Sequence, residues 1–256
     1  MWGVLSRSVA FEDVTDDPLL PLLDLPGVAA GVARTRAAVD ALLTHKTLRR
    51  RSHDVSAESS LRGAWASAAL AGSSVPLADV RAGAVSEPVL QGALRAQAAI
   101  GTLADTWSRA PRQALARLHA LAAADLTAAE ELGRPVAGAE RLDTLAQVLA
   151  STSSPAVVVA AIVHGELLSL DAFAPASGVV ARAAVRLTLV DRGLDPKSLV
   201  VVEAGHRELG DAYASALEAY ASGTPAGVAA WITHCCDAVV AGTQESLAIC
   251  ESIARG

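Results

Sequence analysis

Apolar residues recur every three or four positions along most of the chain, which is the period of an amphipathic helix. From Gly27 to about Arg51 the apolar positions keep this spacing. Further helices are predicted over about residues 56–72, 86–107, 111–124, 138–149, 155–170, 178–191, 204–221 and 225–253. No segment of useful length alternates with the period of two that a half-buried strand requires. The sequence therefore predicts an all-α fold of nine to ten helices with little or no β-structure.

Residues 1–26 lack this periodicity. Pro18, Pro21 and Pro26 fall among acidic residues there, and proline interrupts a helix. We therefore expect residues 1–26 to form an irregular arm over one helical domain that spans residues 27–256.

Composition is consistent with closely packed helices. Of the 256 residues, 52% are apolar but only 3% are aromatic, and alanine, leucine and valine supply most of the apolar side chains. Alanine and leucine are the strongest apolar helix formers. Because large side chains are so few, we expect Trp65, Trp107 and Trp231 to anchor the core.

Charge and cysteine content narrow the class of partner. The net charge of −6 disfavours binding to nucleic acid, which requires clustered cations. The one basic run, residues 49–51, is predicted to be the last turn of a helix, where the helix dipole favours cations. The three cysteines are expected to be reduced thiols packed in the interior. No apolar run is long enough to cross a bilayer. We expect a cytoplasmic protein without a nucleic-acid or membrane partner, and the alanine content is typical of a GC-rich bacterial genome.

Residues 164–196 join an apolar helix, a short loop and a second helix. This segment resembles the signature of the Fic family, HPFx(D/E)GNGRxxR: Phe173 stands at its Phe, Gly178 at its second Gly and Arg182 at its last Arg. His164 matches a histidine on the preceding helix. Residues 67–72 resemble the inhibitory pattern (S/T)xxxE(G/N), with Ala71 where glutamate is expected. The resemblance also includes a Leu-His pair in the middle of the domain. Near the end of the domain it includes a Tyr, a Leu and a Trp-Ile pair, so that it covers residues 55–245.

The resemblance implies the Fido fold and transfer of AMP from ATP to a protein hydroxyl, but the motif is broken. Asp171 falls at the catalytic His, and a carboxylate of ordinary pKa is a weaker base near neutral pH. Pro175 falls at the acidic metal ligand and cannot bind Mg²⁺. Val179 replaces the first Arg. Residues 131–139 are too few for the family's target-docking hairpin.

Part of an anion site is still predicted. Ser177 and Gly178 begin the second helix, whose free N–H groups and dipole favour an anion. Arg182 and Arg186 lie four residues apart and so share a face. We expect these four residues to hold phosphate, ATP or another nucleotide without Mg²⁺. The alternative is that Arg182 pairs with a structural carboxylate while Arg186 faces solvent.

Three functions fit the sequence. The leading hypothesis is a pseudoenzyme whose former nucleotide cleft binds a ligand or a protein partner without efficient AMP transfer. Loss of the inhibitory glutamate at Ala71 together with the catalytic His favours it over an unregulated enzyme. The alternative is an active, divergent nucleotidyl- or phosphotransferase that uses Asp171 or His164. The third is an interaction protein, and the sequence leaves the partner and the oligomeric state open.

Overall fold

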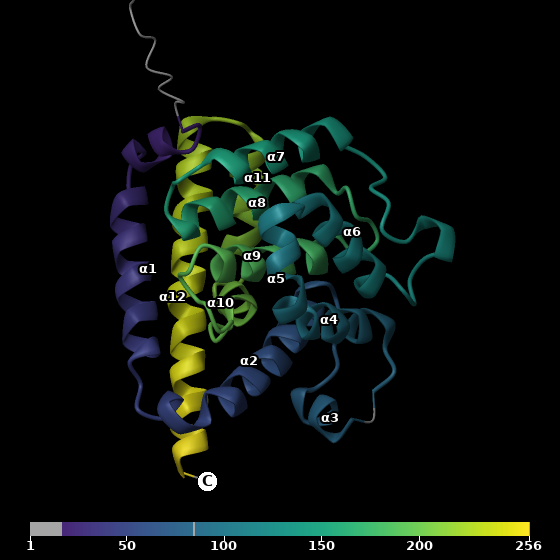
Figure 1. Ribbon diagram of the computed structural model, residues 1–256, viewed down its shortest axis with the longest axis vertical. Helices are drawn as coiled ribbons and strands as arrows, with labels where there is room; N and C mark the ends of the chain where they lie inside the picture. The colour runs from purple at the N-terminus through teal and green to yellow at the C-terminus, as the bar shows by residue number, and fades with distance from the viewer. Residues whose placement is uncertain (1–16, 84, 256) are drawn as a thin grey trace, which may run out of the picture.

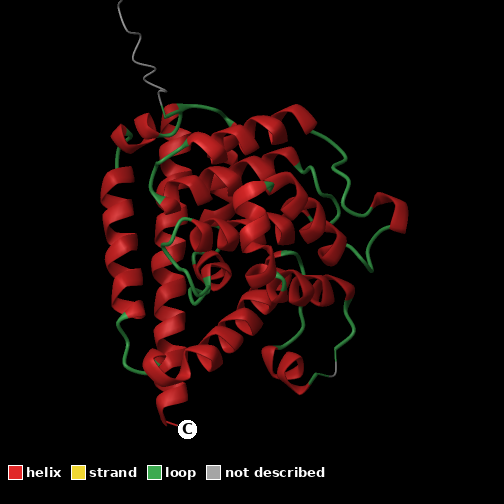
Figure 2. Cartoon of the chain, in the orientation of Figure 1, coloured by secondary structure: helices red, strands yellow, loops and turns green. Residues whose placement is uncertain are grey.

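Helices make up the architecture of the chain, as Figures 1 and 2 show. The computed structural model describes residues 17–83 and 85–255, and these contain no strand. The all-α prediction is confirmed, although the described part of the chain forms twelve α-helices where nine to ten were expected. In order, the elements are η1 (Leu20–Asp24), α1 (Val28–Leu43), α2 (Leu48–Leu70), α3 (Leu77–Ala82), α4 (Pro88–Ala98), α5 (Ile100–Arg109), α6 (Pro111–Ala122), η2 (Ala129–Glu131), α7 (Ala139–Ser151), α8 (Ala156–Leu170), α9 (Ser177–Asp191), α10 (Val202–Glu208), α11 (Ala212–Ala221) and α12 (Pro225–Arg255).

Most of the predicted arm lies outside the described residues, which begin at Asp17. Its last part is not wholly irregular, because Leu20–Asp24 forms a short 3₁₀ helix with proline in its first turn. The single-domain division stays a prediction. None of the described helices is long and apolar enough to cross a membrane.

The basic run marks the first error in the predicted boundaries. The helix expected to reach Arg51 ends at Leu43, and Arg49 to Arg51 lie in the first turn of α2 rather than in a last turn. The intervening turn is fixed by α12, because the Thr47 hydroxyl donates to the Cys250 carbonyl (3.3 Å) and Leu48 is buried. This tertiary contact overrides the continuous apolar pattern.

Three further differences raise the helix count. The helix predicted to reach Trp107 is divided at Ala99 into α4 and α5. The helix predicted over residues 204–221 is divided into α10 and α11 at Gly210, whose φ of 58° ends a helix at little steric cost. The six-residue helix α3 is too short to show a periodic pattern in the sequence.

Helices α8 and α9 lie at the centre of the molecule and separate two apolar clusters. Most residues of α9 are buried, and α8 is apolar on nearly all sides, as expected for a core helix. One cluster joins α8 and α9 to α4, α5 and α6, whereas the other joins them to α1, α10 and α12. Trp107 and Trp231 are buried in these clusters, which confirms their predicted role; Trp65 is only partly buried.

Glycine permits the tightest helix crossing. A Cβ atom built on Gly205 of α10 would lie 1.9 Å from the carbonyl oxygen of Ala238 in α12. Gly242 of α12 faces the same crossing, where its carbonyl accepts the Val201 N–H at 3.3 Å. Helices α10 and α12 therefore meet backbone to backbone, and this contact sets the depth at which His206 lies.

We expect Gly205→Ala to lower the free energy of unfolding by about 3 kcal/mol, because the added methyl group would force apart two packed backbones. The measurement is urea denaturation followed by far-UV circular dichroism. Gly101→Ala is the matched control, since Gly101 is also helical but its Cβ would meet no atom within 4 Å. The control is expected to be neutral or stabilising by up to about 1 kcal/mol. Equal effects of the two substitutions would contradict the tight crossing.

Candidate functional site

The loop between α8 and α9 carries the degenerate Fic-like motif. Helix α8 ends at Leu170 and is followed by Asp171, whose φ of 45° is left-handed, and α9 begins at Ser177, one residue earlier than expected. The side chain of Phe173 points into the core and is 2% exposed. Its backbone N–H donates to the Ser177 hydroxyl (3.0 Å), which closes the loop on itself.

The positions that differ from the Fic pattern are divided between the surface and the core. Asp171 and Pro175 are exposed, whereas Val179 packs in the core. Pro175 offers no side-chain oxygen, so the residues at the expected metal position do not fit Mg²⁺. Within residues 17–83 and 85–255, no three His, Cys, Asp or Glu side chains are grouped so that they could hold a metal ion.

Arg182 lies inside the protein, 4% exposed, with its guanidinium folded back over Gly178 in the first turn of α9. Its Nε donates to the Ser67 hydroxyl (2.9 Å), and Nη2 donates to the Ser67 carbonyl (2.8 Å). Its Nη1 reaches the Tyr213 hydroxyl at 3.5 Å. Among the described residues no carboxylate forms an ion pair with it, so within residues 17–83 and 85–255 the structure does not supply the carboxylate partner that the alternative expected for Arg182.

The segment that resembles an inhibitory helix reaches Arg182 through a different residue. Ala71 lies exposed at the end of α2 and contacts no part of the motif by hydrogen bonding. Ser67, one turn earlier, supplies two of the three acceptors for the guanidinium. The two segments that carry the resemblance therefore meet, but the contact is made by the neutral Ser67 and not by Ala71 at the glutamate position.

Arg186 does not face solvent and does not share the environment of Arg182. It is 2% exposed and forms a two-point ion pair with Glu203 of α10, with both nitrogen–oxygen distances at 2.8 Å. Ser198 accepts a further hydrogen bond from Nη1 (3.1 Å), and Gln97 donates to the same carboxylate. The alternative in which Arg186 faces solvent is wrong. Its donors are used within the protein, which leaves Arg182 as the candidate cation of an anion site.

Three histidines gather next to Arg182, and sequence reasoning identified only one of them. His164 of α8 shares a hydrogen bond with the Tyr213 hydroxyl (2.8 Å), and its Nδ1 is buried without a partner among the described residues. His206 Nδ1 lies 3.0 Å from His234 Nε2. The rings of His164 and His206 are 4.9 Å apart, and Trp231 lies against His164 and His234. Because the histidines come from three separate helices, no spacing in the sequence signals this histidine cluster.

Burial keeps the histidine cluster neutral. Burial, with a smaller contribution from Arg182, holds the pKa of His164 and of His206 well below the ordinary value. Burial also lowers the pKa of His234, although Asp237 opposes this. Burial raises the pKa of Tyr213. His164 is thus a neutral core histidine, in keeping with its position on an apolar helix.

Contacts from two other segments hold the motif loop closed. The Val136 N–H donates to the Ala172 carbonyl (2.9 Å), which joins the short segment before α7 to the loop. The ring of His119 packs on Phe173 with 5.5 Å between ring centroids, and its Nδ1 accepts the Gly133 N–H at 3.1 Å. Ala172, Phe173 and Ser177 are all buried as a result. The motif loop is therefore packed against α6 and against the segment before α7.

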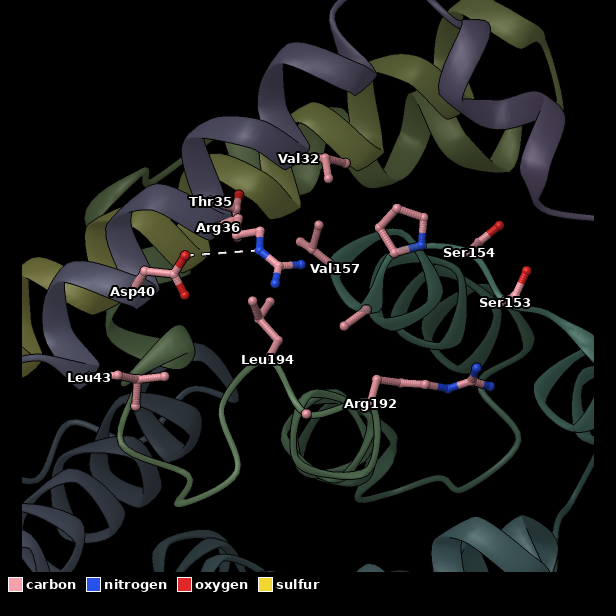
Figure 3. A pocket seen from close by; sticks show the side chains of 13 residues that line it. Val32, Thr35, Arg36, Asp40, Leu43, Ser153, Ser154, Val157, Arg192 and Leu194 are labelled. Atoms are coloured by element: carbon pink, nitrogen blue, oxygen red, sulfur yellow. Dashed lines mark ion pairs between the residues drawn. The ribbon is translucent and has the colours of Figure 1, made fainter.

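An open hollow lies elsewhere, between α1, the start of α8 and the end of α9 (Figure 3). Its volume is about 310 Å³, and Arg36 and Asp40 of α1 form an ion pair (3.9 Å) on one side of it. The residues just before α8 already bind a carboxylate of the protein itself. Asp17 accepts hydrogen bonds from the Thr152 hydroxyl and from the Ser153 N–H, each at 2.7 Å. These hydrogen bonds, that of Thr152 first, hold the pKa of Asp17 below its usual range.

Two solved structures are similar to this fold. A Fic family protein from Desulfovibrio desulfuricans G20 superimposes with a TM-score of 0.70 at 21% identity, over 87% of this chain and 74% of that one. Fic-1 from C. elegans gives a TM-score of 0.65 at 17% identity, over 89% and 75% of the two chains. No protein-family model and no curated protein matches the sequence. The chain has the Fic fold, as the resemblance implied.

Glu203→Gln is expected to destabilise the protein by about 3–5 kcal/mol, because it leaves the Arg186 charge buried without its partner. The free energy of unfolding at pH 7.5 would be measured by urea denaturation. Glu251→Gln is the control, since Glu251 pairs with Arg255 at 3.9 Å on the surface and such pairs contribute little. A loss below about 1 kcal/mol for Glu203→Gln would show that the pair is not a structural requirement.

Proposed function

We propose that this chain is a Fic-fold pseudoenzyme that binds an anionic group at Arg182, from a nucleotide or a protein partner, without transferring AMP. The observation that carries the proposal is Arg182 itself: a buried guanidinium, 4% exposed, whose hydrogen-bond acceptors are all neutral. A buried cation without a counter-charge is costly, and an anion placed beside it is correspondingly favoured.

The start of α9 adds to the attraction for an anion. The first backbone N–H groups of a helix lack partners within the helix, and the positive end of its dipole lies at the same place. The Arg182 guanidinium lies over Gly178 in this first turn. A phosphate or carboxylate that displaced Ser67 would meet both the guanidinium and the helix terminus.

The absence of transfer rests on three other positions. Transfer to a hydroxyl needs a group that accepts its proton and cations that neutralise the developing charge. Asp171 is exposed at the surface, Pro175 supplies no metal ligand, and the aliphatic Val179 lies in the core. These positions support loss of transfer more strongly than use of a different donor.

AMP transfer is tested by incubating the protein with labelled ATP and Mg²⁺, alone and in a cell lysate. We expect no label above that of a sample without the protein. Arg182→Met and Asp171→Asn are included as variants. Label that is incorporated by the wild type and lost in either variant would establish the divergent transferase instead.

Anion binding is tested by thermal unfolding with millimolar phosphate, AMP or ATP, each without Mg²⁺. A ligand at 100 times its Kd stabilises by about 2.7 kcal/mol, which raises Tm by a few degrees. We expect a shift in the wild type that Arg182→Met loses and that Arg36→Met keeps, because Arg36 is an exposed arginine on α1, outside the motif. No shift with any ligand would contradict the binding role.

A further inference from the structure

We propose that the protein binds a small amino acid, with one ammonium and one carboxylate group, in a polar pocket at the end of α9. The pocket lies between α2, the junction of α4 with α5, and the loop from α9 to α10, and its volume is about 280 Å³. This is near the lower end of the range for ligand pockets, which suits a molecule of few atoms. Val190 borders the pocket, whereas Gly178 of the motif lies at the other end of α9, about 18 Å away along the helix. The two sites are therefore separate.

The most buried polar side chain that lines the pocket is that of Gln97. It is 6% exposed, and its Nε2 donates to a carboxylate oxygen of Glu203. An ionised carboxylate only accepts hydrogen bonds, so this contact fixes which end of the Gln97 amide is the donor. The other end, Oε1, is buried and has no hydrogen-bond partner among the described residues. A buried acceptor without a partner is costly, and a donor group of a ligand would remove that cost.

The charges buried behind Gln97 favour a cationic donor. Glu203 pairs with Arg186, and both oxygens of Asp195 accept backbone N–H groups at 2.9 and 2.8 Å. Two carboxylates thus accompany one guanidinium beside the pocket, which leaves one negative charge in excess. An ammonium group would bring both the donor that Oε1 needs and a compensating charge. A hydroxyl group would bring the donor alone.

The mouth of the pocket carries the opposite charge. Lys197 and His53 line the pocket and are both exposed, and the lysine ammonium is a cation that can pair with a carboxylate. The half-buried side chains of Ser56, Ser60 and Ser198 supply hydroxyls along the wall. The pocket is therefore negative at its base and positive at its mouth, an arrangement that an amino acid zwitterion complements.

The loop that closes the pocket is held in one conformation. Ser198 has a left-handed φ of 50°, and its hydroxyl and carbonyl accept hydrogen bonds from Arg186 Nη1 at 3.1 and 3.2 Å. The Ser56 hydroxyl donates to the Lys197 carbonyl (3.2 Å), which ties the loop to α2. A residue other than glycine keeps such a conformation only where its surroundings enforce it. The pocket is therefore preformed, which reduces the entropy lost on binding.

An NMR titration of the full chain tests the site. The probes are L-serine and glycine, and two analogues of L-serine are matched controls: glycerate has a hydroxyl in place of the ammonium, and ethanolamine lacks the carboxylate. We expect L-serine to shift the amide resonances of Gly101 and Ser198, which line the pocket, with saturation, and to leave that of Gly178 unchanged. Glycerate should bind at least about tenfold more weakly, because the hydrogen bond to a charged group is lost. Ethanolamine should bind about threefold to fivefold more weakly, because the pair with an exposed cation is lost.

Gly101→Leu blocks the pocket without removing a contact. A Cβ atom at Gly101 would meet no atom within 4 Å, and leucine favours the helix, so this variant is expected to fold. Its Kd for L-serine should rise at least about tenfold, as should that of Gln97→Met, which lacks the acceptor. Lys197→Met should raise the Kd about threefold to fivefold. Lys46→Met is the matched control, since Lys46 is the other lysine of the chain and is exposed, and its Kd should equal that of the wild type.

The titration distinguishes this site from the one at Arg182. Arg182→Met should bind L-serine as the wild type does, so failure of anion binding at Arg182 would refute the proposed function and leave this site standing. Equal binding of glycerate and L-serine would overturn the assignment of an ammonium ligand. Absence of a saturable shift with L-serine and glycine at high millimolar concentrations, or an unchanged Kd in Gly101→Leu, would overturn the site itself.

Discussion

The structure depends on accommodating two arginines of one helix inside the core. Arg182 and Arg186 follow each other by one turn on α9, and both are almost completely buried. A buried guanidinium must have its donors satisfied, since an unpaired one would cost several kcal/mol. Arg186 requires Glu203 and so fixes α10, while Arg182 requires Ser67 and Tyr213 and so fixes α2 and α11. Four helices, α9 among them, are thereby positioned by this pair.

This requirement explains why some residues of the Fic-like motif matter to the fold while other positions of the motif do not. Three motif residues contribute to the fold. Arg182 joins α2 to α9, Gly178 leaves room for the guanidinium, and Phe173 fills the core beneath His119. Asp171 and Pro175 lie on the surface, where folding imposes little on their identity. Motif residues can be required by the fold itself, so motif matches alone do not establish an activity.

The sequence predicted the fold class and the α8–loop–α9 segment because these rest on local periodicity and on a short motif. The prediction from sequence was wrong where a contact with a distant segment determines the end of a helix or the partner of a side chain. The end of α1 depends on Thr47 meeting α12, and the partner of Arg186 comes from α10, 17 residues further along. Gly210 could have indicated the break between α10 and α11. The histidine cluster could not be foreseen, since nothing local marks His206 and His234 as neighbours.

Arg182 and the histidines constrain each other. A guanidinium that lacks a carboxylate partner can be tolerated in the core only while the groups around it are uncharged. The neutral forms of His164 and His206 satisfy that condition, and Arg182 in turn helps to hold their pKa values low. An added carboxylate would stabilise Arg182 and also raise the pKa of the histidines. Ser67, which accepts two hydrogen bonds without a charge, keeps the guanidinium in place without neutralising it. The neutral site is therefore compatible with a binding role that a permanent ion pair would abolish.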